Sequence, residues 1–359
     1  MLADSLHNLL PLPLPFSSIS ISILLLPLTL HLLWRLLPSP HKPTQTTTNK
    51  HTKHRSSFYT PTTPDSPTTT ITPLSTITPS TLPSLPPDRW YLDPSLISPS
   101  RIYTPTMALR PCAPSDWLRL DALHPTRMAH KRAAVRTHGW QAVGGALACR
   151  PEADGAVEEL VAMLGAYLPA RFPGLWSRED GGRWLRNAAT GERFEVVAPW
   201  GGLGHPLEVV AGVVEEDVAV LMEGGEEDEE EYVLKAAVSA FPAGFDIQDK
   251  IGRPLTAIHE PVPAYREKLR RAMNKFFKKV TADRLVMRVN WGINEREELF
   301  FLDGTHLYEG DEASADPNID IDQVQLRVER QVLRRLPKSG AICMLTKTYV
   351  ARFTTVDGN

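Results

Sequence analysis

The amino-terminal quarter of the chain is poor in the residues that build a hydrophobic core, and this limits what the chain can fold into. Residues 1–87 are rich in Pro, Ser, Thr and Leu, with runs such as "TPTTPDSPTTTITPLSTITPSTLPSLPP". Such a segment lacks the mixture of large apolar and helix-forming residues that a core requires. We therefore expect a disordered Pro/Ser/Thr-rich linker over residues 38–87. Residues 88–359 are then left for one domain with a substantial core.

A hydrophobic segment covers residues 1–37. Residues 5–34 contain no Asp, Glu, Lys or Arg and include "SISISILLLPLTLHLLW". This length suffices to cross a bilayer, although the serines and prolines weaken the pattern. Basic residues follow the segment, so that an inserted segment would leave the rest of the chain in the cytoplasm. Two interpretations stay open: a membrane anchor that contacts lipid through residues 5–34, or an upstream extension without a membrane role.

Charge and cysteine usage exclude several classes of protein. Residues 107–359 carry 32 basic and 38 acidic residues, and this mildly acidic balance argues against a nucleic-acid-binding surface. The three cysteines lie far apart and form no CxxC pair, which is typical of a reducing compartment. The same pattern argues against a cysteine-built zinc site and against a self-contained iron–sulfur cluster. We expect a cytoplasmic domain without a nucleic-acid partner.

Hydrophobic periodicity predicts a mixture of helices and antiparallel strands. Helical spacing predicts a short helix after an N-cap at Ser115 and longer helices over residues 155–169, 262–280 and 322–336. Alternation predicts a hairpin over residues 183–197 and strands over residues 216–223, 232–241, 284–293 and 341–350. The acidic run "GGEEDEEE" is interpreted as a solvated hairpin loop. The mixture indicates an α+β domain rather than a wound parallel sheet, and the sequence contains no nucleotide-binding glycine loop.

The predicted helix over residues 322–336 places Glu329 on the same face as Leu326 and Leu333. A carboxylate directed toward a core needs a partner or a chemical role, and Arg327 and Arg330 are within its reach. On spacing alone, a buried Glu–Arg clamp that holds the helix explains this pattern better than catalysis does.

Several other polar and aromatic residues stand at conspicuous positions. Arg288 and Asn290 project to one side of their predicted strand, beside Trp291. His259 ends the short β-type run "LTAIH" before two prolines, and His205 stands in "GHPLEVV". On motif physics alone, an arginine bonded to loop carbonyls and two histidines with structural hydrogen bonds account for these positions.

Seven segments, taken in order, resemble the haem-dependent oxidative N-demethylase-like family, whose fungal members are called HRQ proteins. The segments are "TMALRPCAPSDWLRLD", "YLPARFP", "HPLEVVAGVVEEDVAVLM", "FPAGFDIQDKIGRPLTAIHEPVPAY", "MNKFFKKV", "RVNWGI" and "RVERQVLRRLPKSGAI". The resemblance runs from Asp88 to Val350 and implies a PAS-like antiparallel sheet with flanking helices that binds haem b. The chain departs from the family at Val332, where threonine is usual. Because relatives continue further, we expect the domain to be truncated after Asn359.

The resemblance implies oxidative removal of a methyl group from a small secondary alkylamine such as dimethylamine, with oxygen as co-substrate. It implies that His259 is the axial ligand of the haem iron, with His205 as the alternative. The other residues expected around the haem are Phe276, Phe277, Arg288, Asn290 and Trp291. Glu329 becomes the candidate acid/base or amine-binding carboxylate, because a methylammonium ion is a cation. Arg327 or Arg330 is expected to stabilise reduced oxygen species or a haem propionate.

Electrons for this chemistry have to come from another protein. The resemblance implies a partner that carries flavin and an iron–sulfur cluster and that uses reduced nicotinamide. This chain has too few cysteines and no nucleotide motif to hold them itself. We therefore expect a separate electron-transfer reductase, besides the amine and oxygen. Two alternatives stay open: a non-enzymatic haem-binding PAS-like sensor, and a degenerate family member without haem.

Overall fold

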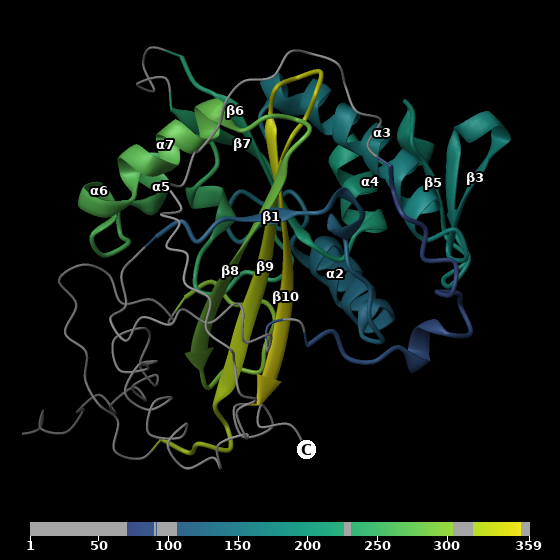
Figure 1. The fold of residues 1–359 in the computed structure, drawn as a ribbon, viewed down its shortest axis with the longest axis horizontal. Coiled ribbons are helices and arrows are strands. Elements are labelled where there is room, and N and C mark those ends of the chain that lie inside the picture. The colour runs from purple at the N-terminus through teal and green to yellow at the C-terminus, as the bar shows by residue number, and fades with distance from the viewer. Residues whose placement is uncertain (1–69, 90, 92–105, 226–230, 304–318, 353–359) are drawn as a thin grey trace, which may run out of the picture.

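A computed structural model of the chain describes residues 70–89, 91, 106–225, 231–303 and 319–352 (Figure 1). The hydrophobic segment over residues 1–37 and residues 38–69 of the expected linker lie outside this described part. Among the described residues, no helix combines the length and the apolar character needed to cross a membrane.

A seven-stranded antiparallel sheet forms the centre of the fold, with the strand order β1-β8-β9-β10-β6-β7-β2. Its strands are β1 (Arg110–Cys112), β2 (Leu147–Cys149), β6 (Asp217–Glu223), β7 (Tyr232–Val238), β8 (Leu285–Asn294), β9 (Gln325–Arg335) and β10 (Ile342–Arg352). A small second sheet contains β3 (Trp176–Glu179), β4 (Trp184–Asn187) and β5 (Arg193–Glu195). This confirms the α+β class, the hairpin over residues 183–197 and the strands expected at β6, β7, β8 and β10. The PAS-like topology stays a prediction.

Helices cover both faces of the large sheet (Figure 1). On one side lie α2 (His124–His138), α3 (Asp154–Arg171) and α4 (Pro206–Val213), and on the other lie α5 (Leu255–His259), α6 (Tyr265–Lys268) and α7 (Arg270–Lys279). Short 3₁₀ turns lie at Leu82–Ser84, Pro114–Asp116, Pro151–Ala153, Asp180–Gly182, Trp200–Gly202 and Ile247–Asp249. Each face of the sheet therefore has its own hydrophobic core.

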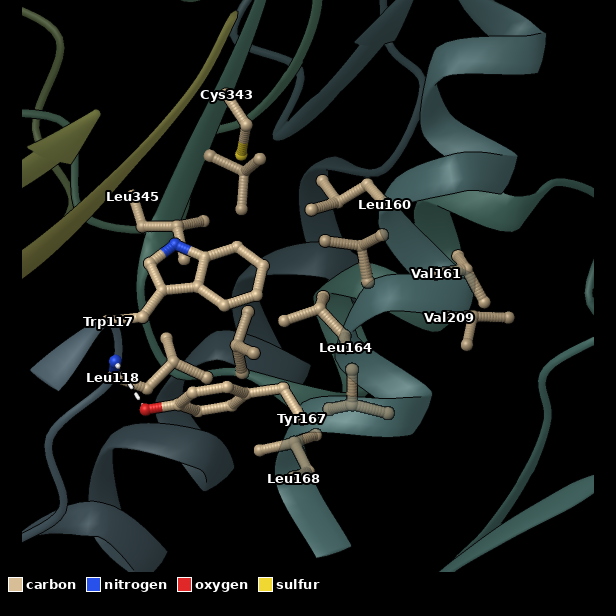
Figure 2. Packing of buried hydrophobic residues seen from close by; sticks show 14 of the residues in the cluster. Trp117, Leu118, Leu160, Val161, Leu164, Tyr167, Leu168, Val209, Cys343 and Leu345 are labelled. Atoms are coloured by element: carbon tan, nitrogen blue, oxygen red, sulfur yellow. Dashed lines mark hydrogen bonds between the residues drawn. The ribbon is translucent and has the colours of Figure 1, made fainter. Parts of the chain in front are cut away.

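The larger core lies between the sheet, α3 and α4, and Figure 2 shows its centre around Trp117, Leu164 and Tyr167. Helix α3 buries the apolar residues that its helical spacing predicts, and it continues through Pro169 to Arg171. The proline lies in the last turn, where its missing N–H removes one helical hydrogen bond close to the end of the helix. The Phe172 N–H still donates to the Leu168 carbonyl. The expected end at Pro169 is therefore two residues early.

The predicted helix over residues 322–336 is wrong, because this segment forms strand β9. The segment pairs with β10 along its whole length and with β8 from Gln325 to Leu333. Its Leu, Arg, Glu and Gln residues favour a helix locally, but pairing with two strands satisfies the backbone hydrogen bonds. The pairing also buries Val328 and Val332, and Val332 packs in the larger core. Tertiary pairing has overridden local propensity. In the strand, Glu329 shares a face with Leu333 but not with Leu326.

Three local predictions near the candidate site also need correction. The β-type run ending at His259 is helix α5, because the carboxylate of the distant Glu231 accepts the Thr256 N–H in its first turn. The single helix over residues 262–280 is interrupted at Leu269, whose φ of −115° separates α6 from α7. Ser115 is not an N-cap but lies inside a 3₁₀ turn.

Residues 70–89, which we call the amino-terminal strap, pack against the domain although most of them were expected to belong to the linker. Ile77 and Leu82 are buried in the larger core. The Leu74 N–H donates to the Arg171 carbonyl at 2.7 Å, and Asp88 accepts from Arg119 at 2.8 Å. The few apolar residues between the prolines are enough to hold the strap on the domain, because α3 supplies an apolar surface for them to cover. The folded unit therefore begins before Asp88.

A buried ion pair joins β10 to the end of α4. Lys347 Nζ lies 2.5 Å from the Glu215 carboxylate and 3.5 Å from that of Asp121, and all three side chains are buried. We expect Lys347→Met to lower the free energy of unfolding by about 3–5 kcal/mol, because it removes the ammonium that faces the buried carboxylates of Glu215 and Asp121. Urea unfolding measures this. The exposed Lys279→Met is the control, with an expected change within about 0.5 kcal/mol, and equal effects of the two changes would contradict the argument.

Candidate functional site

The register of β8 and β9 decides which of the predicted site residues meet. Asn290 lies opposite Glu329 and Arg288 lies opposite Gln331, so these four side chains share one face of the sheet. Alternation along β9 adds Arg327 to the same face. This face is the one that α5, α6 and α7 cover, since Leu333 from the same face packs in their core. The residues Arg327, Glu329, Gln331 and Asn290 are called the Glu329 cluster below.

Glu329 is the half-buried acceptor at the centre of this cluster. Its carboxylate accepts from Arg327 Nε at 3.3 Å, from Gln331 Nε2 at 3.2 Å and from Asn290 Nδ2 at 3.4 Å. Arg327 itself is buried, and it also donates from Nη2 to the Phe241 carbonyl. Its Nη1 is buried and has no hydrogen-bond partner within the described residues. The cluster therefore holds a fixed carboxylate and a buried cation with an unused donor.

Lys250 belongs to the same region, although sequence reasoning missed it. Its ammonium lies 4.1 Å from the centroid of the Phe245 ring. Burial lowers the pKa of Lys250, and the nearby charge of Glu329 acts in the opposite direction. A lone lysine in "DIQDKIGR" has no sequence signal of its own, because only the sheet register and the loop after β7 bring it near Glu329.

His259 ends α5, and its ring is held in one orientation. Nδ1 lies 2.8 Å from the Leu255 carbonyl oxygen, and the ring stacks on Tyr265 with centroids 5.1 Å apart. Because a carbonyl only accepts, Nδ1 carries the proton and Nε2 keeps a lone pair. Nε2 has no hydrogen-bond partner within the part of the chain that the structure describes. Burial lowers the pKa of His259 to about 4, the Leu255 hydrogen bond opposes this, and the charges of Lys250 and Arg288 lower the pKa further.

The neutral state of His259 makes a prediction about pH. Between pH 6.5, the ordinary pKa of histidine, and about pH 4, the unfolded chain binds a proton at residue 259 that the folded chain excludes. The stability that this adds is fully present above pH 6.5 and falls as the pH falls toward 4. We expect the free energy of unfolding of the haem-free protein to decrease more steeply over this window than that of His259→Gln. Urea unfolding at several pH values measures both slopes, and parallel slopes would contradict the prediction.

Glu231 holds α5 in place. Its buried carboxylate accepts from the Thr256 N–H at 2.9 Å, from the Thr256 hydroxyl at 2.6 Å and from Asn274 Nδ2 at 2.5 Å. Burial raises the pKa of Glu231, but these hydrogen bonds and the charge of Arg270 outweigh it, so the pKa is lowered. In the sequence, Glu231 ends the acidic run "GGEEDEEE", which is expected to form a solvated hairpin loop. Residues 226–230 of that loop lie outside the described residues, but its last member, Glu231, is a buried anchor.

Replacing Glu231 with glutamine tests this anchor. The amide has one acceptor oxygen in place of two, so we expect a loss of about 1–3 kcal/mol in the local stability of α5. Hydrogen exchange of the backbone amides of residues 256–259 measures it. Glu223→Gln, an exposed change in the same hairpin, is the matched control. Equal protection of these amides in the two variants would show that Glu231 does not hold the helix.

His205 is not equivalent to His259. It is the N-cap of α4, where Nδ1 accepts the Leu207 N–H at 3.0 Å, and Nε2 lies 3.1 Å from an Asp154 oxygen. With Nδ1 accepting, the neutral ring carries its proton on Nε2 and donates it to Asp154. Cys149, Asp154 and His205 bring their ligand atoms within 4.8 Å of one another. The histidine nitrogen that faces this group has no lone pair to offer, so the structure argues against both a metal there and His205 as iron ligand.

The structure also separates Arg330 and the predicted aromatic residues from the cluster. Arg330 lies on the opposite face of β9, buried, and donates to the Asp116 carbonyl at 2.5 Å, which is a structural role. Trp291 lies opposite Val328 on that same face of the sheet and is 40% exposed. Phe277 is buried in the core under α7, and Phe276 packs edge-on against it. An aromatic ring that does lie beside the cluster is Phe301, whose centroid is 5.8 Å from the Arg327 guanidinium carbon.

The chain also matches a known protein family. Residues 108–359 match the model of the family described as haem-dependent oxidative N-demethylase, alpha subunit-like. The chain belongs to this family. Family membership indicates haem dependence and an oxidoreductase of the oxidative N-demethylase type, and it confirms the resemblance found in the sequence.

The chemistry of the residues around His259 fits a haem group. A neutral imidazole with its second nitrogen fixed by a carbonyl is the form in which histidine binds a metal. The ammonium of Lys250 is suited to an anionic group such as a propionate. The three cysteines of the chain, Cys112, Cys149 and Cys343, are free thiols.

Proposed function

We propose that this chain removes a methyl group oxidatively from a small secondary alkylamine such as dimethylamine, with haem, oxygen and electrons from a separate reductase. The observation that carries the proposal is the neutral His259 with a free Nε2, on the side of the sheet that holds the Glu329 cluster. In balanced form, the amine, one oxygen molecule, two electrons and two protons yield the primary amine, formaldehyde and water.

His259 is the proposed axial ligand through Nε2, and Glu231 is its positioning residue because it anchors α5. Haem, when bound, supplies the oxidation of the methyl group. Lys250, Arg288 and Arg327 are the cations proposed to bind its propionates. The hydrogen bond from Nδ1 to Leu255 keeps His259 in the tautomer that binds iron.

Glu329 is the proposed amine-binding carboxylate. A dialkylammonium ion carries one positive charge, and a half-buried carboxylate attracts it more strongly than an exposed one does. Glu329 can also accept the ammonium proton, which leaves the neutral amine ready for oxidation. Arg327 donates to one oxygen of the carboxylate, and Gln331 and Asn290 both donate to the other. The fixed orientation reduces the entropy lost on binding.

A haem-binding sensor without catalysis is the second candidate. It is favoured by one observation: the charge of Glu329 is already neutralised by Arg327 at 3.3 Å, which weakens its attraction for an ammonium ion. A sensor would bind haem through His259 in the same way, so that haem binding alone does not separate the two functions.

Formaldehyde release separates them. The haem-loaded chain, a flavin reductase, a [2Fe–2S] ferredoxin, reduced nicotinamide and oxygen are combined with dimethylamine, and formaldehyde is measured against a reaction without amine. We expect formaldehyde in proportion to the nicotinamide consumed. A chain that takes up haem and accepts electrons but releases no formaldehyde from secondary amines would support the sensor.

A further inference from the structure

The positive charge of the domain is concentrated on α6 and α7, which lie on the same side of the sheet as α5 and His259 (Figure 1). Residues 265–284 carry eight basic and two acidic residues. The rest of residues 107–359 carries 24 basic and 36 acidic residues. One short segment of an otherwise acidic domain is therefore strongly basic.

The two faces of α7 differ in character. Met273 and Phe277 are buried in the core beneath the helix. On the other face, exposed cations follow one another at four-residue spacing, and one more precedes them on α6. These exposed cations are called the basic stripe below: Lys268, Arg271, Lys275 and Lys279.

Local helix stability does not account for the basic stripe. Arg271 lies in the first turn of α7, which contains no acidic residue, and the helix dipole disfavours a cation at that end. Like charges four residues apart also destabilise a helix. Within the described ranges, no side chain of the stripe has an ion-pair or hydrogen-bond partner. Exposed cations on the small sheet, such as Arg186 and Arg193, do pair with carboxylates.

The helix that carries the stripe is joined to the helix of the proposed iron ligand. The carboxylate of Glu231, which anchors α5, accepts from Asn274 Nδ2 and lies 3.6 Å from Arg270 Nε. These two residues of α7 each stand one position before a cation of the stripe. His259 itself stacks on Tyr265, the first residue of α6. The stripe is therefore an exposed surface on the elements that hold His259 from outside.

We propose that the basic stripe is the docking face for the electron donor, and that the donor is a protein with an acidic surface around its redox centre. This rests on the proposed function, which needs electrons from a separate reductase. An acidic protein is attracted by the stripe and repelled by the acidic remainder of the domain, so that charge directs it to the His259 side. Each docking event oxidises the donor by one electron and reduces the haem by one electron. Two such events supply the two electrons of the demethylation.

A membrane surface fits the stripe less well than an acidic protein does. A helix that binds at a bilayer interface inserts an apolar face into the lipid. The apolar face of α7 is already buried in its own core through Met273 and Phe277. The stripe thus offers charge alone, without an apolar surface beside it on the helix.

Calorimetric titration of the haem-free full chain with an oxidised, acidic [2Fe–2S] ferredoxin tests the docking face. We expect binding that weakens as the salt concentration rises, and an affinity about tenfold or more lower in Arg271→Glu/Lys275→Glu. The charge-matched control is Arg136→Glu/Lys338→Glu, which changes exposed residues of α2 and of the turn after β9. Its affinity should stay within about twofold of the wild type, because these charges lie away from the stripe.

Stopped-flow reduction of the haem-loaded chain by the reduced ferredoxin tests the role of the same face in electron transfer. At low salt, the second-order rate constant should fall by about tenfold or more in Arg271→Glu/Lys275→Glu and stay unchanged in the control variant. The two variants should have the same Soret band and melting temperature, which separates weaker docking from damage to the haem site.

Equal affinities of the two double variants would overturn the proposal, and so would a wild-type chain that does not bind the ferredoxin at low salt. Stripe-dependent binding to phosphatidylserine vesicles in place of the ferredoxin would overturn it as well and would assign the stripe to a membrane surface. A chain that takes up no haem would contradict the proposed function. The titrations of the haem-free chain would still support or overturn the docking face in that case.

Discussion

Replacing His259 with alanine is expected to abolish stoichiometric haem binding. The haem-reconstituted wild-type chain should show a Soret band, and His259→Ala should lose most of its intensity, because His259 has a fixed Nδ1–H and an unpartnered Nε2 on the side of the sheet that holds the Glu329 cluster. His124 also has an unpartnered Nε2, but this nitrogen is buried in α2, on the other side of the sheet. Absorption spectroscopy of equal amounts of folded protein measures this. Circular dichroism of both proteins checks that the fold is retained.

The matched control is His205→Ala. We expect it to keep the Soret band and to show a small loss of stability, about 1 kcal/mol, because it removes the N-cap of α4. The reverse result, with the band lost in His205→Ala and kept in His259→Ala, would show that the tautomer argument has selected the wrong ligand. A wild-type chain that folds but takes up no haem would favour the degenerate alternative.

Replacing Glu329 with glutamine is expected to lower kcat/KM for dimethylamine by about 10²–10⁴-fold. Glutamine keeps the shape but neither attracts an ammonium ion nor accepts its proton. The Soret band should be unchanged, because Glu329 does not ligate iron in this proposal. Steady-state formaldehyde release at several dimethylamine concentrations measures the effect.

Glu158→Gln is the control for this change, since it neutralises an exposed carboxylate of α3 far from the cluster in the fold. We expect its kcat/KM to match that of the wild type. Wild-type turnover in Glu329→Gln would remove the carboxylate from the mechanism. A wild-type chain that binds haem but releases no formaldehyde would support the sensor function instead.

The sequence by itself determined the class of the fold and the family. The helical spacing from Val157 to Leu168 produced α3, and the alternating runs produced β6, β7, β8 and β10 within a few residues of their ends. The predictions for these segments are correct because hydrophobic periodicity and local propensity favour the same structure. The candidate pair His259 and Glu329 also came from the sequence, through the family resemblance rather than through spacing.

Only the tertiary structure decided which of these residues share a surface. Strand β9 has helix-favouring residues, and its pairing with β8 and β10 is what turns Arg327 and Glu329 to one face and Arg330 to the other. Side chains repeat on one face every two residues in a strand and every 3.6 residues in a helix. A segment that forms a strand in place of a helix therefore brings different residues onto the same face. The choice between His259 and His205 likewise depended on hydrogen bonds to backbone groups at Leu255 and Leu207, which no periodicity in the sequence reports.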